Sequence, residues 1–208
     1  MSKKQHSSNS DTRESLLRLA AHSFGTQGYS ATSMRSMAQQ AGIEVASIYY
    51  HFPSKEALAD EVMTHGAESI ANHMKDHLAE QPAAATAEQR FRAAVVGQMR
   101  GMIKFGDYAL GDNRLLAQLP EKVRDRQIKR REQHQKLWNT LLEDMKAEGS
   151  LRENADIALC RIFILGCINT MPAWFNPRKG SVEAIADQVC TIFLNGAGGT
   201  QPRESERR

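Results

Sequence analysis

The chain has 208 residues, of which 41% are hydrophobic and 25% are charged, a balance that is typical of a globular protein and excludes an intrinsically disordered one. Lys and Arg number 27 and Asp and Glu number 24, so the net charge of +3 permits a nucleic-acid partner without requiring one. The cysteines are three, Cys160, Cys167 and Cys190, an odd count that excludes a disulfide framework and favours a reducing cytoplasm.

The two ends of the chain lack apolar anchors. Residues 1–10 and residues 196–208 are mostly polar or small, so each is expected to be a disordered tail. The first helical pattern begins after the N-terminal tail and stops at a pair of glycines, Gly25 and Gly28. Its apolar stripe consists of Leu17, Ala20, Ala21 and Phe24.

Two short helices and the start of a longer one follow. Thr32 or Ser33 can cap a helix whose apolar positions are Met34, Met37, Ala38 and Ala41, and Gly42 ends it. The next stripe consists of Val45, Ile48 and Phe52, is closed by Pro53, and precedes a helix capped by Ser54. This spacing predicts a helix-turn-helix domain over residues 11–58.

A second domain is expected over residues 59–195. Within it, a linker-like stretch at residues 81–89 is followed by longer helices. Their apolar stripes lie within residues 91–102, 137–145, 157–171 and 182–193, and Gly149 ends the second of them. No segment shows the alternating pattern of a strand. The predicted fold is therefore all-α, with a small N-terminal domain and a larger helical body.

The most apolar segment, residues 157–175, is a poor candidate for a membrane span. It contains Arg161 and Asn169 and is interrupted by Pro172. The N-terminus has no apolar stretch of the kind found in signal peptides. We therefore expect a cytoplasmic protein with no membrane partner.

Residues 33–52, SMRSMAQQAGIEVASIYYHF, followed by PSKEAL, resemble the N-terminal domain of the tetracycline-repressor (TetR/AcrR) family of bacterial transcription regulators. The resemblance covers residues 11 to about 62 without a gap and depends on the joint spacing of these elements. Position 44 departs from the usual serine and is Glu44. The tetracycline repressor itself carries an acidic residue there, so the departure does not weaken the resemblance.

Candidate DNA contacts follow from the chemistry of this segment. Small or polar residues at the start of a recognition helix let its backbone enter the major groove, and donors around it can bind phosphates. The resemblance adds Arg35, whose guanidinium can pair with guanine. Each residue also has a structural interpretation, as a core aromatic, a solvated charge or a helix cap. The full set is Thr32, Ser33, Arg35, Val45, Ala46, Ser47, Tyr49, Tyr50, His51 and Lys55.

No pattern of enzyme chemistry is present. The sequence has no glycine-rich phosphate loop or nucleophile elbow, so we expect no enzymatic activity and no cofactor. His65, His73 and His77 have helical metal-ligand spacing, but a solvated helix face explains them as well, and no metal site is predicted. The cysteines are interpreted as packing residues, with a redox sensor as the alternative.

The resemblance implies that the body binds a small-molecule effector and forms a homodimer. The last two apolar stripes are wide enough to pair with their copies as a four-helix bundle, although an intramolecular core could also use them. A two-fold dimer requires a palindromic operator in double-stranded DNA. The expected function is a ligand-responsive transcriptional repressor. The alternatives are a helical small-molecule-binding protein without sequence-specific DNA binding, and an enzyme that uses the pocket of the body.

Residues 165–189 contain Asn169, Trp174, a turn at residues 177–180 and a run at residues 183–187. On these features the segment resembles the corresponding part of family members that control fatty-acid and steroid catabolism, some of which sense acyl-CoA thioesters. An acyl chain needs an apolar tunnel, for which the candidate ligand-binding residues are Met99, Met102, Phe105, Trp138 and Trp174. CoA phosphates need cations, and residues 114–136 hold eight Lys or Arg against three acidic residues. The cations named for this role are Lys122, Arg126, Lys129, Arg130 and Arg131, which could equally form a solvated face.

Overall fold

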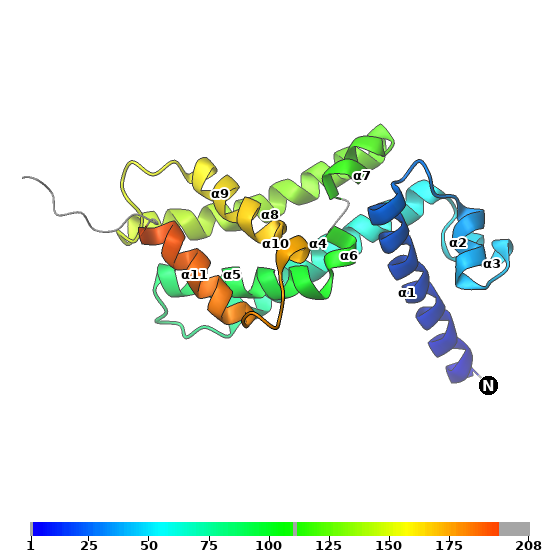
Figure 1. Ribbon diagram of the computed structural model, residues 1–208, viewed down its shortest axis with the longest axis horizontal. Helices are drawn as coiled ribbons and strands as arrows, with labels where there is room; N and C mark the ends of the chain where they lie inside the picture. Colours follow the sequence, from blue (N-terminus) through cyan, green and yellow to red (C-terminus); the bar gives the residue numbers. More distant parts are fainter. Residues whose placement is uncertain (1, 110–111, 196–208) are drawn as a thin grey trace, which may run out of the picture.

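A computed structural model describes residues 2–109 and 112–195 of the chain. The described part is helical and contains no strand, which confirms the all-α prediction (Figure 1). The helices are α1 (Ser2–Gln27), α2 (Met34–Ala41), α3 (Val45–His51), α4 (Lys55–Ala79), α5 (Ala87–Lys104), α6 (Gly106–Ala109), α7 (Asp112–Gln118), α8 (Glu121–Ala147), α9 (Ile157–Asn169), α10 (Met171–Trp174) and α11 (Val182–Asn195).

The N-terminal tail prediction is corrected by helix α1. The helix starts at Ser2, so residues 2–10 continue a helix that composition alone had assigned to a disordered tail. Leu16, Leu17 and Ala20 anchor α1 in the core. Once a helix is anchored, each further turn adds hydrogen bonds without the cost of a new nucleus, and polar residues can join it. The predicted C-terminal tail, residues 196–208, lies outside the described residues.

The helix-turn-helix forms as the caps predict. Ser33 caps α2, since its hydroxyl accepts a hydrogen bond from the backbone N–H of Ser36. Gly42 ends α2 in the left-handed conformation at φ +67°, which a residue with a side chain rarely adopts. Ser54 caps α4 by accepting from the N–H of Ala57. These caps place α3 across α2, at the end of the molecule (Figure 1).

The head, which we define as α1–α3 with the start of α4, shares its core with the body. Its buried cluster includes Ile48 and Phe52, and also Leu115 of α7, Leu119 between α7 and α8, and Val123 of α8. The predicted boundary between residues 58 and 59 falls inside α4, which runs from the head into the body. Gln118 of α7 also accepts hydrogen bonds from the backbone N–H and hydroxyl of Ser30. Head and body are therefore joined by α4 and by the α7–α8 region.

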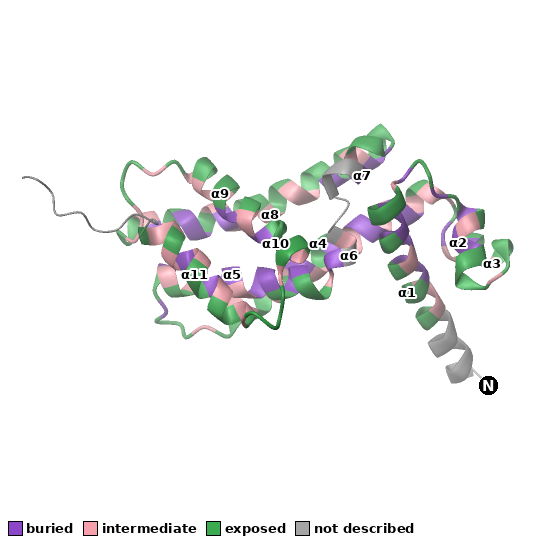
Figure 2. Cartoon of the chain, in the orientation of Figure 1, coloured by how far each residue is buried: buried purple, intermediate pink, exposed green. Residues whose placement is uncertain are grey.

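The body is built around the close packing of α4 and α5. A Cβ added at Gly97 would lie 2.7 Å from the carbonyl oxygen of His73 and 2.8 Å from Cα of Met74, so only glycine fits there. Helices α8, α9 and α11 cover this pair and enclose a second core (Figure 2). Phe91, Trp138, Leu142 and Ile164 are fully buried in it.

Helix α9 buries a different set of residues from the one expected to form a dimer surface. Ile164 and Ile168 belong to the apolar stripe at residues 157–171 that was expected to pair with its copy, but they are fully buried in the core of the protomer, as the intramolecular alternative predicts. The exposed apolar face consists of Leu159, Ile162 and Phe163, each at least 60% exposed. Periodicity marks an apolar helix correctly, but it does not identify which face meets the protomer's own core when apolar residues lie on most sides.

One stretch of the described residues, Ile157–Trp174, is long and apolar enough by composition to cross a membrane, with a mean hydropathy of 1.5. It is divided between α9 and α10, and the 13 residues of α9 span only about 20 Å, against roughly 30 Å for a bilayer core. Arg161, in the middle of α9, donates a hydrogen bond to Asn139. These features favour a helix that packs on protein.

Candidate nucleic-acid interface and effector body

The outer face of α3 carries exposed side chains. Val45 is 38% exposed, Tyr49 49% and Tyr50 77%, and Ala46 is exposed as well. Ile48, in contrast, is fully buried and attaches α3 to the head core. Tyr49 and Tyr50 are thus not core aromatics. The helix offers one uncovered face that starts with small side chains and continues with hydroxyl donors.

The remaining candidates surround this face. Arg35 on α2 and Ser33 at its cap are exposed, while Ser47 and His51 are half-buried. Thr32 differs from the others because it is 4% exposed and its hydroxyl donates to the carbonyl of Tyr29 at 2.9 Å. Its side chain therefore stabilises the turn before α2 and is not free to bind a phosphate.

Lys55, at the first turn of α4, is positioned by Tyr29. Its Nζ lies 4.1 Å from the centre of the Tyr29 ring, within the range of a cation–π contact. Partial burial lowers the pKa of Lys55, and the neighbouring carboxylate of Glu56 acts in the opposite direction. Burial, followed by the charge of Glu56, raises the pKa of Tyr29 to about 12. The lysine therefore has a defined position at the edge of the α3 face.

Three of the five predicted effector residues lie in the body core. Met99 and Trp138 are fully buried and Met102 is 4% exposed, in the same cluster. Phe105 is half-buried and packs its ring against those of His65 and His73. Trp174 is 47% exposed, and its Nε1 donates to the hydroxyl of Thr170, so it lies on the outside of the body.

The structure adds a polar cluster that the sequence analysis did not identify. Oε1 of Gln98, which is 2% exposed, accepts from Nε1 of Trp138 at 2.9 Å and lies 2.8 Å from Nε2 of His134. The amide nitrogen of Gln98 donates to Oδ1 of Asn169 at 3.0 Å. A glutamine between Gly97 and Met99 on an apolar stripe is a sequence signal for such a cluster, but its partners come from α8 and α9.

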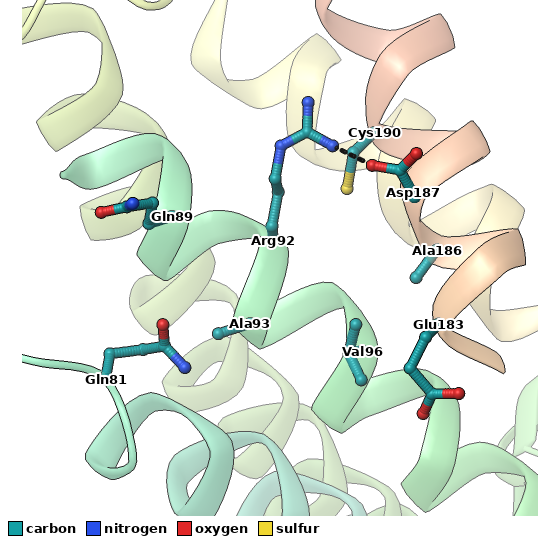
Figure 3. Close-up of a pocket in the computed structure, with 9 residues that line it drawn as sticks. All are labelled: Gln81, Gln89, Arg92, Ala93, Val96, Glu183, Ala186, Asp187 and Cys190. Carbon is teal, nitrogen blue, oxygen red and sulfur yellow. Dashed lines mark hydrogen bonds and ion pairs between the residues drawn. The ribbon is translucent and has the colours of Figure 1, made fainter. Parts of the chain in front are cut away.

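A surface cleft of about 280 Å³ lies between α5 and α11 (Figure 3). Ala93, Ala186 and Cys190 are among the residues that line it, and none of the predicted effector residues does. Arg92 crosses the cleft and bonds Asp187 at 2.8 Å. Burial raises the pKa of the Cys190 thiol to about 11, so little of the reactive thiolate exists at neutral pH.

Arg126 and Arg130, which were both proposed for CoA phosphates, have partners within the protomer. Arg126 pairs with Asp60 at 2.7 Å, and Arg130 lies 3.8 Å from the same carboxylate. Gln127 also donates to Asp60, so these α8 residues bind α4 near the head. Lys122 and Lys129 are exposed.

The histidines with metal-ligand spacing form hydrogen bonds within the protein. Nδ1 of His73 bonds the carbonyl of Ser69, and Nδ1 of His77 bonds the carbonyl of His73. Nε2 of His77 lies 3.1 Å from Arg100. Within the described ranges, no group of three or more His, Cys, Asp or Glu side chains is arranged to hold a metal ion.

Comparison with known proteins identifies the class. Residues 16–62 match the family described as bacterial regulatory proteins, tetR family, and residues 84–197 match the tetracyclin repressor-like C-terminal domain. The chain thus belongs to the tetracycline-repressor family of transcription regulators, whose N-terminal helix-turn-helix binds DNA.

Among relatives, the chain is 29% identical over 196 residues to the HTH-type transcriptional repressor KstR2 of Mycolicibacterium smegmatis, covering 91% of this chain and 92% of the relative. The structure of the ketosteroid transcriptional regulator KstR2 of Mycobacterium tuberculosis superposes with a TM-score of 0.76 at 25% identity, covering 88% and 93% of the two chains. The TetR-family regulator PfmR of Thermus thermophilus shares the fold, with a TM-score of 0.78 at 24% identity over 90% and 97%.

Proposed function

We propose that the protein is a homodimeric transcriptional repressor that binds a palindromic operator and is released from it by a small-molecule effector. The observation that carries this proposal is the uncovered face of α3, where Val45, Tyr49 and Tyr50 are exposed at the end of the molecule. Exposed aromatic side chains on a short helix do not stabilise an isolated protomer. A DNA groove and its phosphates would cover them. Repression itself is inferred from the KstR2 relatives, which are named repressors.

The exposed face of α9 supports dimerisation. Leu159, Ile162 and Phe163 point away from the protomer core, and the ring of Phe163 stacks on Phe193 of α11 at 6.2 Å. Ile192, the neighbour of Phe193 in α11, is 46% exposed. An apolar surface of this kind on two adjacent helices fits a second copy of the chain, which would add its own α9 and α11.

We place the effector in the body core around Met99, Met102 and Trp138. These residues are buried together, and methionine side chains can rearrange around an apolar ligand. An acyl-CoA thioester is one candidate, motivated by the resemblance of residues 165–189 to regulators of fatty-acid and steroid catabolism. Its phosphates could use Lys122 or Lys129, because Arg126 and Arg130 are already paired.

The test is a fluorescence-anisotropy titration of the protein with the DNA upstream of its own gene. We expect tight binding to a fragment that contains an inverted repeat, and weaker binding to a scrambled fragment of equal length. Adding acyl-CoAs of increasing chain length, free CoA and free fatty acids then identifies the effector class. Equal affinity for both fragments would instead indicate a helical small-molecule-binding protein without sequence-specific DNA binding.

A further inference from the structure

The hydrogen bonds around Gln98 determine which nitrogen of His134 carries a proton. Because the amide nitrogen of Gln98 donates to Asn169, its oxygen faces His134, 2.8 Å from Nε2. Two acceptors would repel each other at that distance, so Nε2 must carry a proton and donate it. Nε1 of Trp138 supplies the second donor to the same oxygen at 2.9 Å, which is closer than the 3.2 Å that separates Nε1 from Nε2 of His134. Both lone pairs of the Gln98 oxygen are therefore used.

The remaining nitrogen of the ring is an acceptor. Burial, with a smaller contribution from the charge of Lys75 on α4, lowers the pKa of His134 to about 4, so the ring is neutral at pH 7 and holds a single proton. Since that proton is on Nε2, Nδ1 presents a lone pair. Nδ1 is buried and has no hydrogen-bond partner among the described residues. Buried polar atoms in native proteins nearly always have a partner, so this atom requires an explanation.

The surroundings of the cluster can adapt to a ligand. Five of the nine methionines of the chain are buried in the body core that contains Trp138. They come from α4, α5, α8 and α10, and they are Met74, Met99, Met102, Met145 and Met171. Methionine is unbranched and flexible at several bonds, so a core rich in it can repack and open space for an apolar molecule.

We propose that His134 binds a hydroxyl group of the effector, which donates its hydrogen bond to Nδ1 while the apolar part of the effector displaces methionine side chains. The inference rests on the proposed effector function and specifies the part of the ligand that enters the core as uncharged, apolar and bearing a hydroxyl group. A ketone or a carboxylate offers only acceptors and leaves Nδ1 without a donor. A cation is disfavoured because Lys75 lies close enough to lower the pKa of the ring.

The test compares alcohols with ketones of the same skeleton. Two probe pairs are used, cyclohexanol with cyclohexanone and testosterone with androstenedione, and each is titrated into the full-length protein with nitrogen-15 in its histidines. The signal of His134 is assigned by its loss in His134→Gln. We expect the alcohols to shift the Nδ1 signal and to bind at least about tenfold more tightly than their ketones. In His134→Phe the ratio should fall to within about twofold, while His22→Gln, a change at an exposed histidine of α1, should keep it.

The proposal is overturned if neither alcohol moves the Nδ1 signal, or if the ketones move it equally, since Nδ1 would then bond a buried water molecule. It is also overturned if the preference for alcohols survives in His134→Phe. Operator binding by the unliganded wild-type protein is measured separately. If the wild-type protein binds no operator, the proposed function fails, whereas tight operator binding without any preference for alcohols refutes only the role of His134.

Discussion

Tyr49 and Lys55 both lie at the edge of the open α3 face, but only the lysine is charged. If both contact phosphates, Tyr49→Phe and Lys55→Ala should each weaken binding to operator and to random DNA by similar factors, because phosphate contacts carry no sequence information. The salt dependence should separate them. Removing the lysine should reduce the slope of log K against log salt by about one unit, and removing the hydroxyl should leave the slope unchanged.

Lys129→Ala is the control for this pair. Lys129 is an exposed cation on α8, and the variant lowers the total charge by the same amount as Lys55→Ala. We expect it to leave both the affinity and the slope unchanged. A change in the preferred DNA sequence on mutating Tyr49 or Lys55 would contradict their assignment to phosphates.

His134 should make the protein sensitive to acid. Its pKa is lowered from 6.5 in the unfolded chain to about 4 in the fold, so below pH 6.5 the unfolded chain takes up a proton that the folded one does not. The free energy of unfolding should therefore fall as the pH decreases from about 6.5 to about 4, by on the order of 3 kcal/mol. Urea titrations at a series of pH values measure this loss.

His134→Gln isolates the contribution of this histidine, because glutamine has no proton to gain in that range. The variant is expected to be less stable at pH 7 but to lose less stability on acidification than the wild type. If wild type and variant lose the same amount between pH 6.5 and pH 4, other groups cause the acid sensitivity.

At the scale of elements, the contact between α4 and α5 depends on two glycines one turn apart. A Cβ at Gly97 would lie 2.7 Å from backbone atoms of α4, whereas one at Gly101 would lie 3.0 Å from Cα of Ile70. Alanine gains about 0.5–1 kcal/mol in helix propensity, but forcing a packed interface apart costs about 1–3 kcal/mol. We expect Gly97→Ala to lower the free energy of unfolding by about 2 kcal/mol, and Gly101→Ala to lower it less. Equal free energies of unfolding for the two variants would contradict the expectation that the closer contact at Gly97 tolerates a methyl group less well.

At the scale of the whole molecule, the dimer is predicted to depend on the exposed face of α9. Each large apolar side chain removed from water there contributes roughly 1.5–3 kcal/mol. Phe163→Asp, which changes both copies, should weaken dimerisation at least about 100-fold, or about 2.7 kcal/mol. Sedimentation equilibrium measures this directly, and operator affinity should fall in parallel.

Ile128→Asp serves as the matched control, because Ile128 is an exposed apolar residue on α8 that lies outside this face. Its dimer dissociation constant should stay within about threefold of wild type, about 0.6 kcal/mol. If Phe163→Asp remains a dimer at micromolar concentration, the two copies associate through another surface.

The effector and the operator are each expected to weaken binding of the other to the dimer. Two recognition helices must lie roughly 34 Å apart to enter successive major grooves, and a ligand that repacks the body core can change this separation through α4 and α8. An effector that weakens operator binding tenfold must itself bind the operator complex tenfold less tightly, about 1.4 kcal/mol of coupling. Calorimetry of the effector with free and operator-bound protein measures both factors, and unequal factors would indicate that the effector also binds elsewhere.

Most of the features that the sequence predicted correctly depend on interactions between residues close together in the chain. The caps Ser33 and Ser54, the left-handed Gly42 and the helical spacing of apolar residues act within a few positions of the chain, so they predicted α2, α3 and the start of α4 correctly. The joint spacing from Phe24 to Leu58 was enough to predict the family. The buried side of α3 followed only in part, because Ile48 and Phe52 of the predicted stripe are in the core, whereas its third member, Val45, is 38% exposed.

The tertiary structure decided which face of each apolar helix is buried and which distant side chains meet. Ile164 and Phe163 are adjacent in an almost wholly apolar segment, yet one is in the core and the other is 60% exposed. The hydroxyl of Thr32 donates to the carbonyl of Tyr29 and so is not available to DNA. Three different helices bring Gln98, His134 and Asn169 into contact. Hydrophobicity and helix propensity describe a residue and its near neighbours, whereas the burial of a given face depends on the packing of whole helices against one another.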